Sequence, residues 1–410
     1  MRHLVAFIAA CALPASAQSG VEAPLARALR EASALKAKGD AAGALAAYER
    51  AARLNPKSAE IEDEIGFLYA VMKRHREAQT HLERAVALDP KFAPAHYHLG
   101  VLYWLEEDPN RAIPELQTAV ALSPKAFDYQ FRLGVAFHEV GHYEESAAHL
   151  RIATALAPRS APAWNALGLA LQHSGDLAGA RAAYQKAMEL APGEQEYRNN
   201  LGFILVQTRE ADKGIAEFRK MLEMDPKNAM ARVNLGFAYI QKGEFEAAIE
   251  ELRRAIAIDP GIPTAHYDLG LALKQKDDIE GAKKELREAL RLDPNLVEAH
   301  YTLGIACWQN GEFEETANQM RAAIALRPDY AEAHYMLGTA LKQKGDLDGA
   351  IAALREAIRL DPENPGPYNT LGQVLRVKGD IEGSRQAFAQ GARAKAKKEA
   401  AQAEMLKKKP

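Results

Sequence analysis

The chain has 410 residues, of which 26% are charged and 7% aromatic, and its formal net charge is -3. This composition is typical of an ordered protein and excludes an intrinsically disordered one. The nearly neutral charge argues against a general nucleic-acid-binding protein, which would carry a basic excess. As an ordinary globular protein, a chain of this length would form two or three domains.

Residues 1–17 have the features of a secretory signal peptide. Arg2 precedes an apolar run from Leu4 to Leu13, and Ala15-Ser16-Ala17 follows as a small-residue cleavage pattern. We therefore predict cleavage after Ala17, a short lead-in at residues 18–24, and an exported protein, either periplasmic or secreted. The alternative is an outer-membrane lipoprotein with a lipid anchor at Cys11. No later segment is apolar enough to predict a transmembrane segment.

After the lead-in, the sequence repeats with a constant period of 34 in the residue numbering. A proline closes each repeat, at Pro56, Pro90, Pro124, Pro158, Pro192, Pro226, Pro260, Pro294, Pro328 and Pro362. A glycine recurs with the same period, at Gly66, Gly100, Gly134, Gly168, Gly202, Gly236, Gly270, Gly304, Gly338 and Gly372. We call the first set the repeat prolines and the second set the repeat glycines. A period kept this strictly indicates a tandem repeat, and its length is a known solenoid period.

Each repeat predicts two antiparallel helices. In the repeat that ends at Pro362, apolar residues fall mostly three or four positions apart, which is the helical period. Gly345 interrupts this pattern, because glycine adopts the left-handed conformation that ends a helix, and Asp346 can cap the next helix. Pro362 ends the second helix, since it has no amide hydrogen. The same break recurs at Gly39-Asp40, Gly141-His142, Gly175-Asp176, Gly243-Glu244, Gly311-Glu312 and Gly379-Asp380.

The residues at fixed positions of each repeat resemble the tetratricopeptide repeat family. In the repeat from Ala161, the matching residues are Trp164, Leu167, Gly168, Leu171, Ala180, Tyr184, Ala187 and Pro192. The resemblance implies an all-α, right-handed superhelical solenoid of stacked helix pairs, with about eleven repeats over residues 25–396. We expect the basic tail at residues 397–410 to form a helical cap. Pro114 lies inside one second helix, where we expect a local kink.

No motif in the sequence indicates catalysis or a cofactor. The chain has no Gly-rich phosphate loop, no H-E-x-x-H, no G-x-S-x-G and no C-x-x-C, so we predict a non-enzymatic protein. His266, His300 and His334 share one repeat position on successive helices, and we expect packed rings there rather than a metal site. Cys307 replaces the tyrosine of other repeats, so we expect a buried, unreactive thiol.

The first helix of each repeat carries the candidate binding surface. In the resembled family, first helices line a concave groove where partners bind. The positions 30, 27, 23, 20 and 19 before the repeat proline share one face of that helix. Our candidate partner-binding residues on this face are Tyr97, Trp104, Phe131, Asn165, Asn199, Tyr267, Lys274, Tyr301, Trp308, Tyr335 and Lys342. The alternative is that the apolar members pack between adjacent first helices as core.

These features predict a protein-protein interaction scaffold of the bacterial cell envelope that binds a protein or peptide in the concave groove. One alternative is a polysaccharide-export or envelope-assembly scaffold whose aromatic rings contact glycan. A less favoured alternative is an enzyme with catalysis inside the solenoid. We do not expect a carboxylate clamp of the kind some family members use, since tyrosines and aliphatics occupy the positions that would need Lys and Asn. We expect no nucleic-acid partner.

Overall fold

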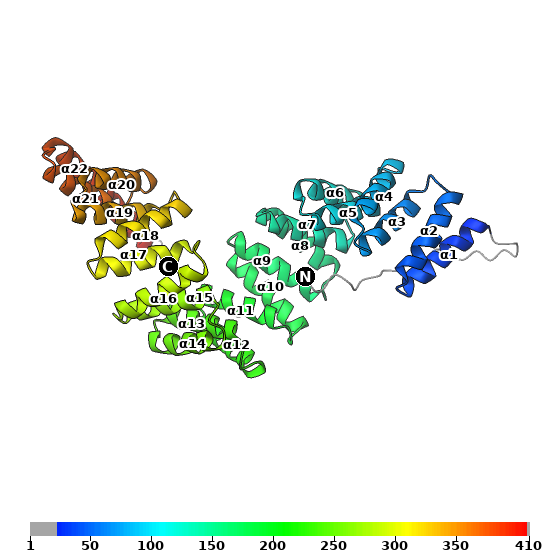
Figure 1. Ribbon diagram of the computed structural model, residues 1–410, viewed down its shortest axis with the longest axis horizontal. Coiled ribbons are helices and arrows are strands. Elements are labelled where there is room, and N and C mark those ends of the chain that lie inside the picture. The colour runs from blue at the N-terminus through cyan, green and yellow to red at the C-terminus, as the bar shows by residue number, and fades with distance from the viewer. Residues whose placement is uncertain (1–22, 408–410) are drawn as a thin grey trace. The chain divides into compact units, whose positions relative to one another are not determined.

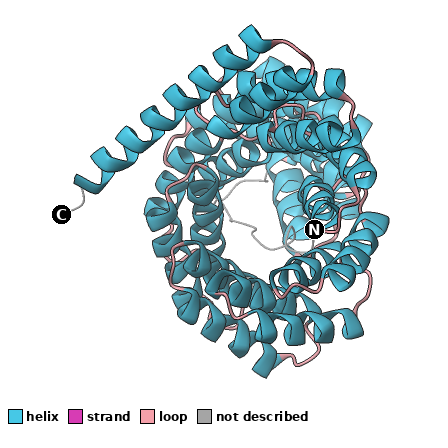
Figure 2. Ribbon diagram, turned by 90° about the vertical axis from the view of Figure 1, so that its left-hand side faces the viewer, coloured by secondary structure: helices cyan, strands magenta, loops and turns pink. Residues whose placement is uncertain are grey.

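The computed structural model describes residues 23–407, and every regular element in that range is an α-helix (Figures 1 and 2). The predicted signal peptide and Cys11 lie outside the described residues. The chain divides into two compact parts, Met1–Tyr197 and Arg198–Pro410, and the boundary falls within α11. Each part is a series of helix pairs, as the repeat pattern predicted.

The helices of the first part are α1 (Pro24–Ala37), α2 (Ala41–Leu54), α3 (Ala59–Val71), α4 (His75–Leu88), α5 (Ala93–Leu105), α6 (Pro109–Leu122), α7 (Phe127–Glu139), α8 (Tyr143–Leu156), α9 (Ala161–His173) and α10 (Leu177–Leu190). The boundary helix is α11 (Gln195–Gln207). The helices that follow are α12 (Ala211–Met224), α13 (Ala229–Lys242), α14 (Phe245–Ile258), α15 (Pro263–Gln275), α16 (Ile279–Leu292), α17 (Val297–Gln309), α18 (Phe313–Leu326), α19 (Ala331–Lys344), α20 (Leu347–Leu360), α21 (Pro365–Val377) and α22 (Ile381–Lys407). Odd-numbered helices are the first helices of the repeats and even-numbered helices are the second.

A residue in the left-handed conformation follows the first helix of every repeat. The seven predicted glycines, from Gly39 to Gly379, have φ between 75° and 89°. In the other repeats, residues with a side chain hold the same position at φ between 59° and 63°, namely Lys73, Glu107, Arg209 and Asp277. Four of the predicted cap positions, Asp40, Asp176, Asp346 and Asp380, accept a backbone amide hydrogen, whereas His142, Glu244 and Glu312 form no side-chain cap. The turn is therefore set by repeat position and not by glycine alone.

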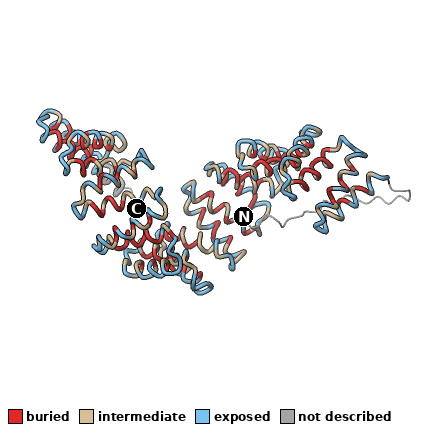
Figure 3. Tube along the Cα trace, viewed as in Figure 1, coloured by how far each residue is buried: buried red, intermediate tan, exposed pale blue. Residues whose placement is uncertain are grey.

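Close contact within ten of the described helix pairs depends on the repeat glycine, and the first pair has the small residue Ala32 at the same position. A Cβ atom built on Gly236 would lie 2.5 Å from Cγ of Leu252, and one on Gly168 would lie 2.5 Å from the ring of Tyr184. Leu252 and Tyr184 have an exposed fraction of 0%. Figure 3 shows buried residues along the whole length of both parts, as expected when each repeat builds its core with its neighbours.

The helix contacts between repeats indicate which surface is the inner one. Within each part, second helices pack against the first helix of the next repeat, as α8 does against α9 and α18 does against α19. Successive first helices also contact each other directly, at α3–α5, α7–α9, α13–α15, α15–α17 and α19–α21. No comparable contact joins successive second helices within residues 23–407. Within each part, the stack therefore curves toward the first helices, whose exposed side we call the inner face.

The sequence predicted special features for two helices, α6 with its internal proline and α22 with the basic tail. The helix α6 runs without a break from Pro109 to Leu122 and contains Pro114, whose missing amide hydrogen leaves one carbonyl without its donor, so the kink expected there stays a prediction. The helix α22 continues through the basic tail to Lys407, and Lys397 forms an ion pair with Glu363 at 2.6 Å. Among the helices described, none is long and apolar enough to cross a membrane.

Candidate functional site on the inner face

The three recurring histidines join consecutive repeats. Nε2 of His266 lies 3.1 Å from the carbonyl oxygen of Pro260, and Nδ1 lies 2.7 Å from Glu285 on the second helix. His300 makes the corresponding contacts, at 3.0 Å to the carbonyl of Pro294 and at 2.7 Å to a side-chain oxygen on α18. The ring of His334 keeps the contact with its own preceding repeat proline, at 3.0 Å. The rings are thus packed at the junctions, as predicted from the sequence.

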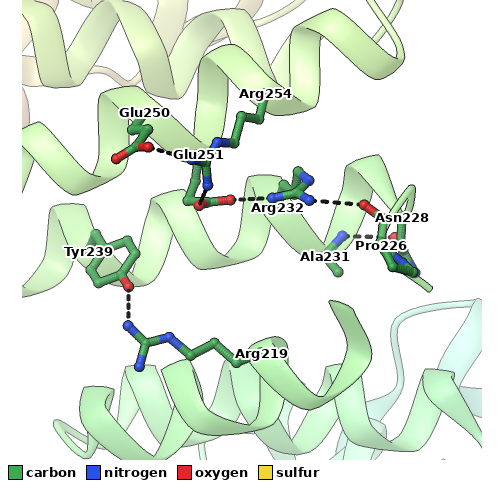
Figure 4. A network of polar contacts seen from close by, with 9 residues as sticks. All are labelled: Arg219, Pro226, Asn228, Ala231, Arg232, Tyr239, Glu250, Glu251 and Arg254. Atoms are coloured by element: carbon green, nitrogen blue, oxygen red, sulfur yellow. Dashed lines mark hydrogen bonds and ion pairs between the residues drawn. The ribbon is translucent and has the colours of Figure 1, made fainter. Parts of the chain in front are cut away.

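The residue type at this junction position varies, but in eight repeats its side chain makes the same contact; at Glu62 the carbonyl of Pro56 instead accepts from Arg84 of the second helix. The position lies six residues after a repeat proline, and the side chains that reach the proline carbonyl are His96, Gln130, Trp164, Arg232, His266, His300, His334 and Tyr368. In Figure 4, Arg232 donates to Pro226 at 2.9 Å and to Glu251 at 2.6 Å. We call these the junction donors. Each of these prolines lies just beyond the end of a second helix and its carbonyl accepts from no described backbone amide, so the side chain satisfies an otherwise unpaired acceptor.

A second set of inter-repeat contacts was not predicted from the sequence. The hydroxyl of Tyr103 donates to Glu83 at 3.0 Å, and Nη2 of Arg219 donates to Tyr239 at 2.7 Å (Figure 4).

Cys307 occupies the same repeat position as Tyr103 and Tyr239, three residues after the repeat glycine, and has an exposed fraction of 0%. Burial, followed by the nearby Glu312 carboxylate, raises the pKa of the Cys307 thiol to about 12. The thiol is thus buried and protonated at neutral pH, which agrees with the expectation of an unreactive cysteine.

Three tyrosines lie on the inner face at one ring per repeat. Tyr267, Tyr301 and Tyr335 belong to α15, α17 and α19, and each is half-buried. The ring centroid of Tyr301 lies 5.0 Å from that of Tyr330, and a Cβ on Gly366 would lie 3.2 Å from the hydroxyl of Tyr335. Burial raises the pKa of both Tyr267 and Tyr301. Each ring therefore packs against its surroundings while part of it remains accessible.

The other aromatic candidates are likewise divided between packing and exposure. Tyr97 stacks on Tyr129 with centroids 4.6 Å apart, and burial raises its pKa. Trp104, Phe131 and Trp308 are all half-buried. The residue that directly follows the repeat glycine is also half-buried, at Phe67, Val101, Val135, Leu169, Phe203, Phe237, Leu271 and Ile305. The inner face thus carries an apolar stripe that is only partly covered by adjacent helices.

The polar candidates differ from one another in their pairing. Asn165 has an exposed fraction of 5%, and its Nδ2 donates to Glu196 at 3.1 Å. The side chain of Asn199 accepts a hydrogen bond from Asn234 in the next repeat. Lys342 donates to Gln373, also in the next repeat. Lys274 is half-buried and forms no hydrogen bond or ion pair with any described residue, and burial lowers its pKa.

Asp268 is an inner-face residue that sequence reasoning missed. Its exposed fraction is 8%, and it forms no hydrogen bond or ion pair within the described chain. Burial raises the pKa of its carboxyl from 3.8 to about 7. The sequence places Asp268 directly after the candidate Tyr267. Its lack of a partner could be predicted only by knowing which residue of the preceding repeat it faces.

Comparison with known proteins gives a consistent assignment. Family models described as tetratricopeptide repeat or TPR repeat match residues 68–126, 131–194, 195–228, 217–250, 238–277, 270–311, 308–365 and 341–409. The search of curated proteins found no match.

Several solved structures resemble parts or most of the chain. A crystal structure of MamA is 27% identical and covers 40% of this chain and 97% of its own, with a TM-score of 0.39. A MamA structure from Desulfovibrio magneticus RS-1 is 25% identical and covers 41% and 96%, with a TM-score of 0.40. Yeast Tom70 is 13% identical and covers 93% and 96%, with a TM-score of 0.48. On the strength of the family models and the helix-pair repeats, the chain belongs to the tetratricopeptide repeat family of protein-interaction scaffolds.

Proposed function

We propose that this protein is a non-enzymatic scaffold that binds an extended segment of a partner protein along the inner face of α15, α17 and α19. The observation that carries this proposal is the row formed by Tyr267, Tyr301 and Tyr335, with one half-buried ring in each repeat. A ring that is partly held by its neighbours loses little conformational freedom when a partner covers the rest. Tyrosine and tryptophan are the residues most enriched at the energetic centres of interfaces.

The spacing of the rings favours an extended partner. Because the three tyrosines recur with the period of the repeat, each presents the same chemistry to the same side of the stack. Exposed glutamines follow the same order along this face, at Gln275, Gln309 and Gln343. Amide side chains can donate to and accept from a peptide backbone. A partner segment lying along the repeats would therefore meet an aromatic contact and an amide in each one.

The test removes two rings and leaves the outer surface as a control. Tyr301→Ala combined with Trp308→Ala should weaken capture of partner protein from an envelope extract, and the affinity for a purified captured partner should fall at least about tenfold. The control combines Ile258→Ala with Leu326→Ala, two residues on second helices that are each 40% exposed. Unchanged affinity in a first variant that keeps its helical circular dichroism would refute the proposal. Binding of wild-type protein to a glycan array, without a protein partner, would favour the glycan-scaffold alternative.

We further propose that the protein is exported, on the basis of the N-terminal sequence pattern. The mature chain should begin at Gln18, immediately after the small-residue pattern that ends at Ala17. Mass spectrometry of protein from its native host tests this expectation directly. A chain that begins with a lipidated Cys11 would instead identify a lipoprotein.

A further inference from the structure

The inner face of α15 has an acidic residue that lacks the partner its position normally provides. The residue two positions before the repeat glycine bonds to the preceding first helix in other repeats. Nδ1 of His98 lies 2.8 Å from Oδ1 of Asp63, and Nδ2 of Asn234 donates to Asn199. In both cases the partner belongs to the first helix of the preceding repeat. At Asp268, the corresponding residue of the preceding repeat is Val233, whose side chain cannot form a hydrogen bond. The register of the repeat therefore leaves this carboxylate without a partner among residues 23–407.

Asp268 is enclosed but remains open to contact. Its exposed fraction is only 8%, so most of the water that would solvate a carboxylate is excluded. Neither carboxylate oxygen is among the completely buried polar atoms that lack a partner, so each keeps some accessible surface. Half-buried Phe237 and Leu271 belong to the apolar stripe of the same two repeats. An unpaired carboxylate next to apolar surface is costly in the free protein, and a cation that reaches it removes that cost.

The same helix carries an unpaired cation. Lys274 follows Asp268 by six residues, which is about 9 Å along the helix axis and about 120° around it, so the two Cα atoms lie about 10 Å apart. The equivalent lysines in other repeats are paired, since Lys36 donates to Glu64 at 2.5 Å and Lys342 donates to Gln373. Lys274 has no such contact among the described residues and is half-buried. One helix of the inner face thus presents an unmet negative charge and an unmet positive charge at a fixed separation.

We propose that the inner face of α15 binds a partner segment in which a basic side chain pairs with Asp268 and an acidic side chain pairs with Lys274. This inference rests on the proposed function and specifies the chemistry of the partner. In an extended chain, residues two or three apart span about 7 to 10 Å. The segment therefore has its basic and acidic residues two or three positions apart, with apolar side chains beside them that contact Phe237 and Leu271. The two opposite charges also fix the direction in which the segment lies, because the reversed segment places like charges together.

The probe is a random dodecapeptide library displayed on phage and selected on the full chain. Wild-type protein should enrich peptides that contain Lys or Arg with Asp or Glu two or three positions away. Enriched peptides are then synthesised with a fluorescent label, and their affinity is measured by anisotropy. Asp268→Asn should weaken binding at least tenfold, whereas Glu223→Gln, which removes one exposed carboxylate from α12, should leave it unchanged.

A thermodynamic cycle identifies the pairing itself. Replacing the basic residue of the peptide by Gln should weaken binding to wild-type protein but cause little further loss with Asp268→Asn, since the contact is already gone. Additive losses, or selected peptides without a basic residue, would overturn this inference. If Asp268→Asn leaves the peptide affinity unchanged but Tyr301→Ala with Trp308→Ala lowers it, the inference fails and the proposed function stands. If no peptide is enriched, both fail.

Discussion

Asp268→Asn should stabilise the protein at neutral and alkaline pH. Asparagine has nearly the same shape as protonated aspartate, so the substitution removes the charge without creating a cavity. In the wild type, burial raises the pKa of this carboxyl from 3.8 to about 7, and Tyr267 is the titratable group that interacts with it. The folded state therefore holds a proton that the unfolded state releases. By linkage, this group makes the protein progressively less stable as pH rises from about 4 to about 7.

The size of the effect follows from the difference between the two pKa values. A pKa difference of about three, at about 1.4 kcal/mol for each, gives about 4 kcal/mol at pH 8. This is an upper bound, because the accessible oxygens allow water to reach the charge and local relaxation to reduce its cost. We expect the free energy of unfolding of Asp268→Asn to exceed that of the wild type by about 2 to 4 kcal/mol at pH 8. At pH 4 the two proteins should differ by less than about 1 kcal/mol, since Asp268 is then protonated in the folded state and close to half protonated in the unfolded state.

Urea denaturation followed by circular dichroism at pH 4 and pH 8 measures this difference, and hydrogen exchange shows where it arises. Hydrogen exchange is needed because a solenoid unfolds in segments, so a single transition is not assured. Protection should rise in α13, α15 and α17 and stay constant near the chain ends. The control is Glu223→Gln, which changes the net charge equally at an exposed site. A stabilisation equal at both pH values, or a destabilisation at pH 8, would refute the argument from burial.

Two further predictions concern the repeat framework. Gly236→Leu should lower stability by at least about 1–3 kcal/mol, because a side chain there meets Leu252, and hydrogen exchange should increase most in α13, α14 and their neighbours. An equal loss of protection in all repeats would contradict this expectation. Asp277→Gly should raise stability by about 1 kcal/mol, because Asp277 has φ of 59° at the position where seven repeats have glycine. A lower urea midpoint for this variant would show that its side chain compensates for the backbone conformation.

The repeat pattern predicted most of the fold because helix boundaries depend on local chemistry. The glycine that ends a first helix and the proline that ends the second act within a few residues, so their common period carries the architecture directly. The search for glycine alone left out Lys73, Glu107, Arg209 and Asp277, which hold the same left-handed turn. The repeat period places these four residues at the turn position, but none of them is a residue type that predicts a left-handed turn.

The candidate site was less predictable because it depends on contacts between repeats. The sequence identified Tyr267, Tyr301 and Tyr335 as sharing one face, but it did not show that each ring would be half-buried. Asp268 was missed for the same reason. Whether a carboxylate is paired depends on the residue one repeat earlier, and that pairing becomes visible only when neighbouring helices are placed side by side.

The junction donors have a consequence for how this chain can change length. In the eight repeats that carry a junction donor, donor and acceptor lie six residues apart in the sequence, so a single short stretch encodes both halves of the contact. Duplication or loss of one whole period therefore carries complete junctions with it and leaves no carbonyl without a donor. The requirement at this position is only a polar hydrogen within reach, which explains how histidine, glutamine, tryptophan, arginine and tyrosine can replace one another there. In these eight repeats a position that varies in residue type thus keeps one chemical role, and whole repeats can be gained or lost by recombination without changing the contact at the new junction.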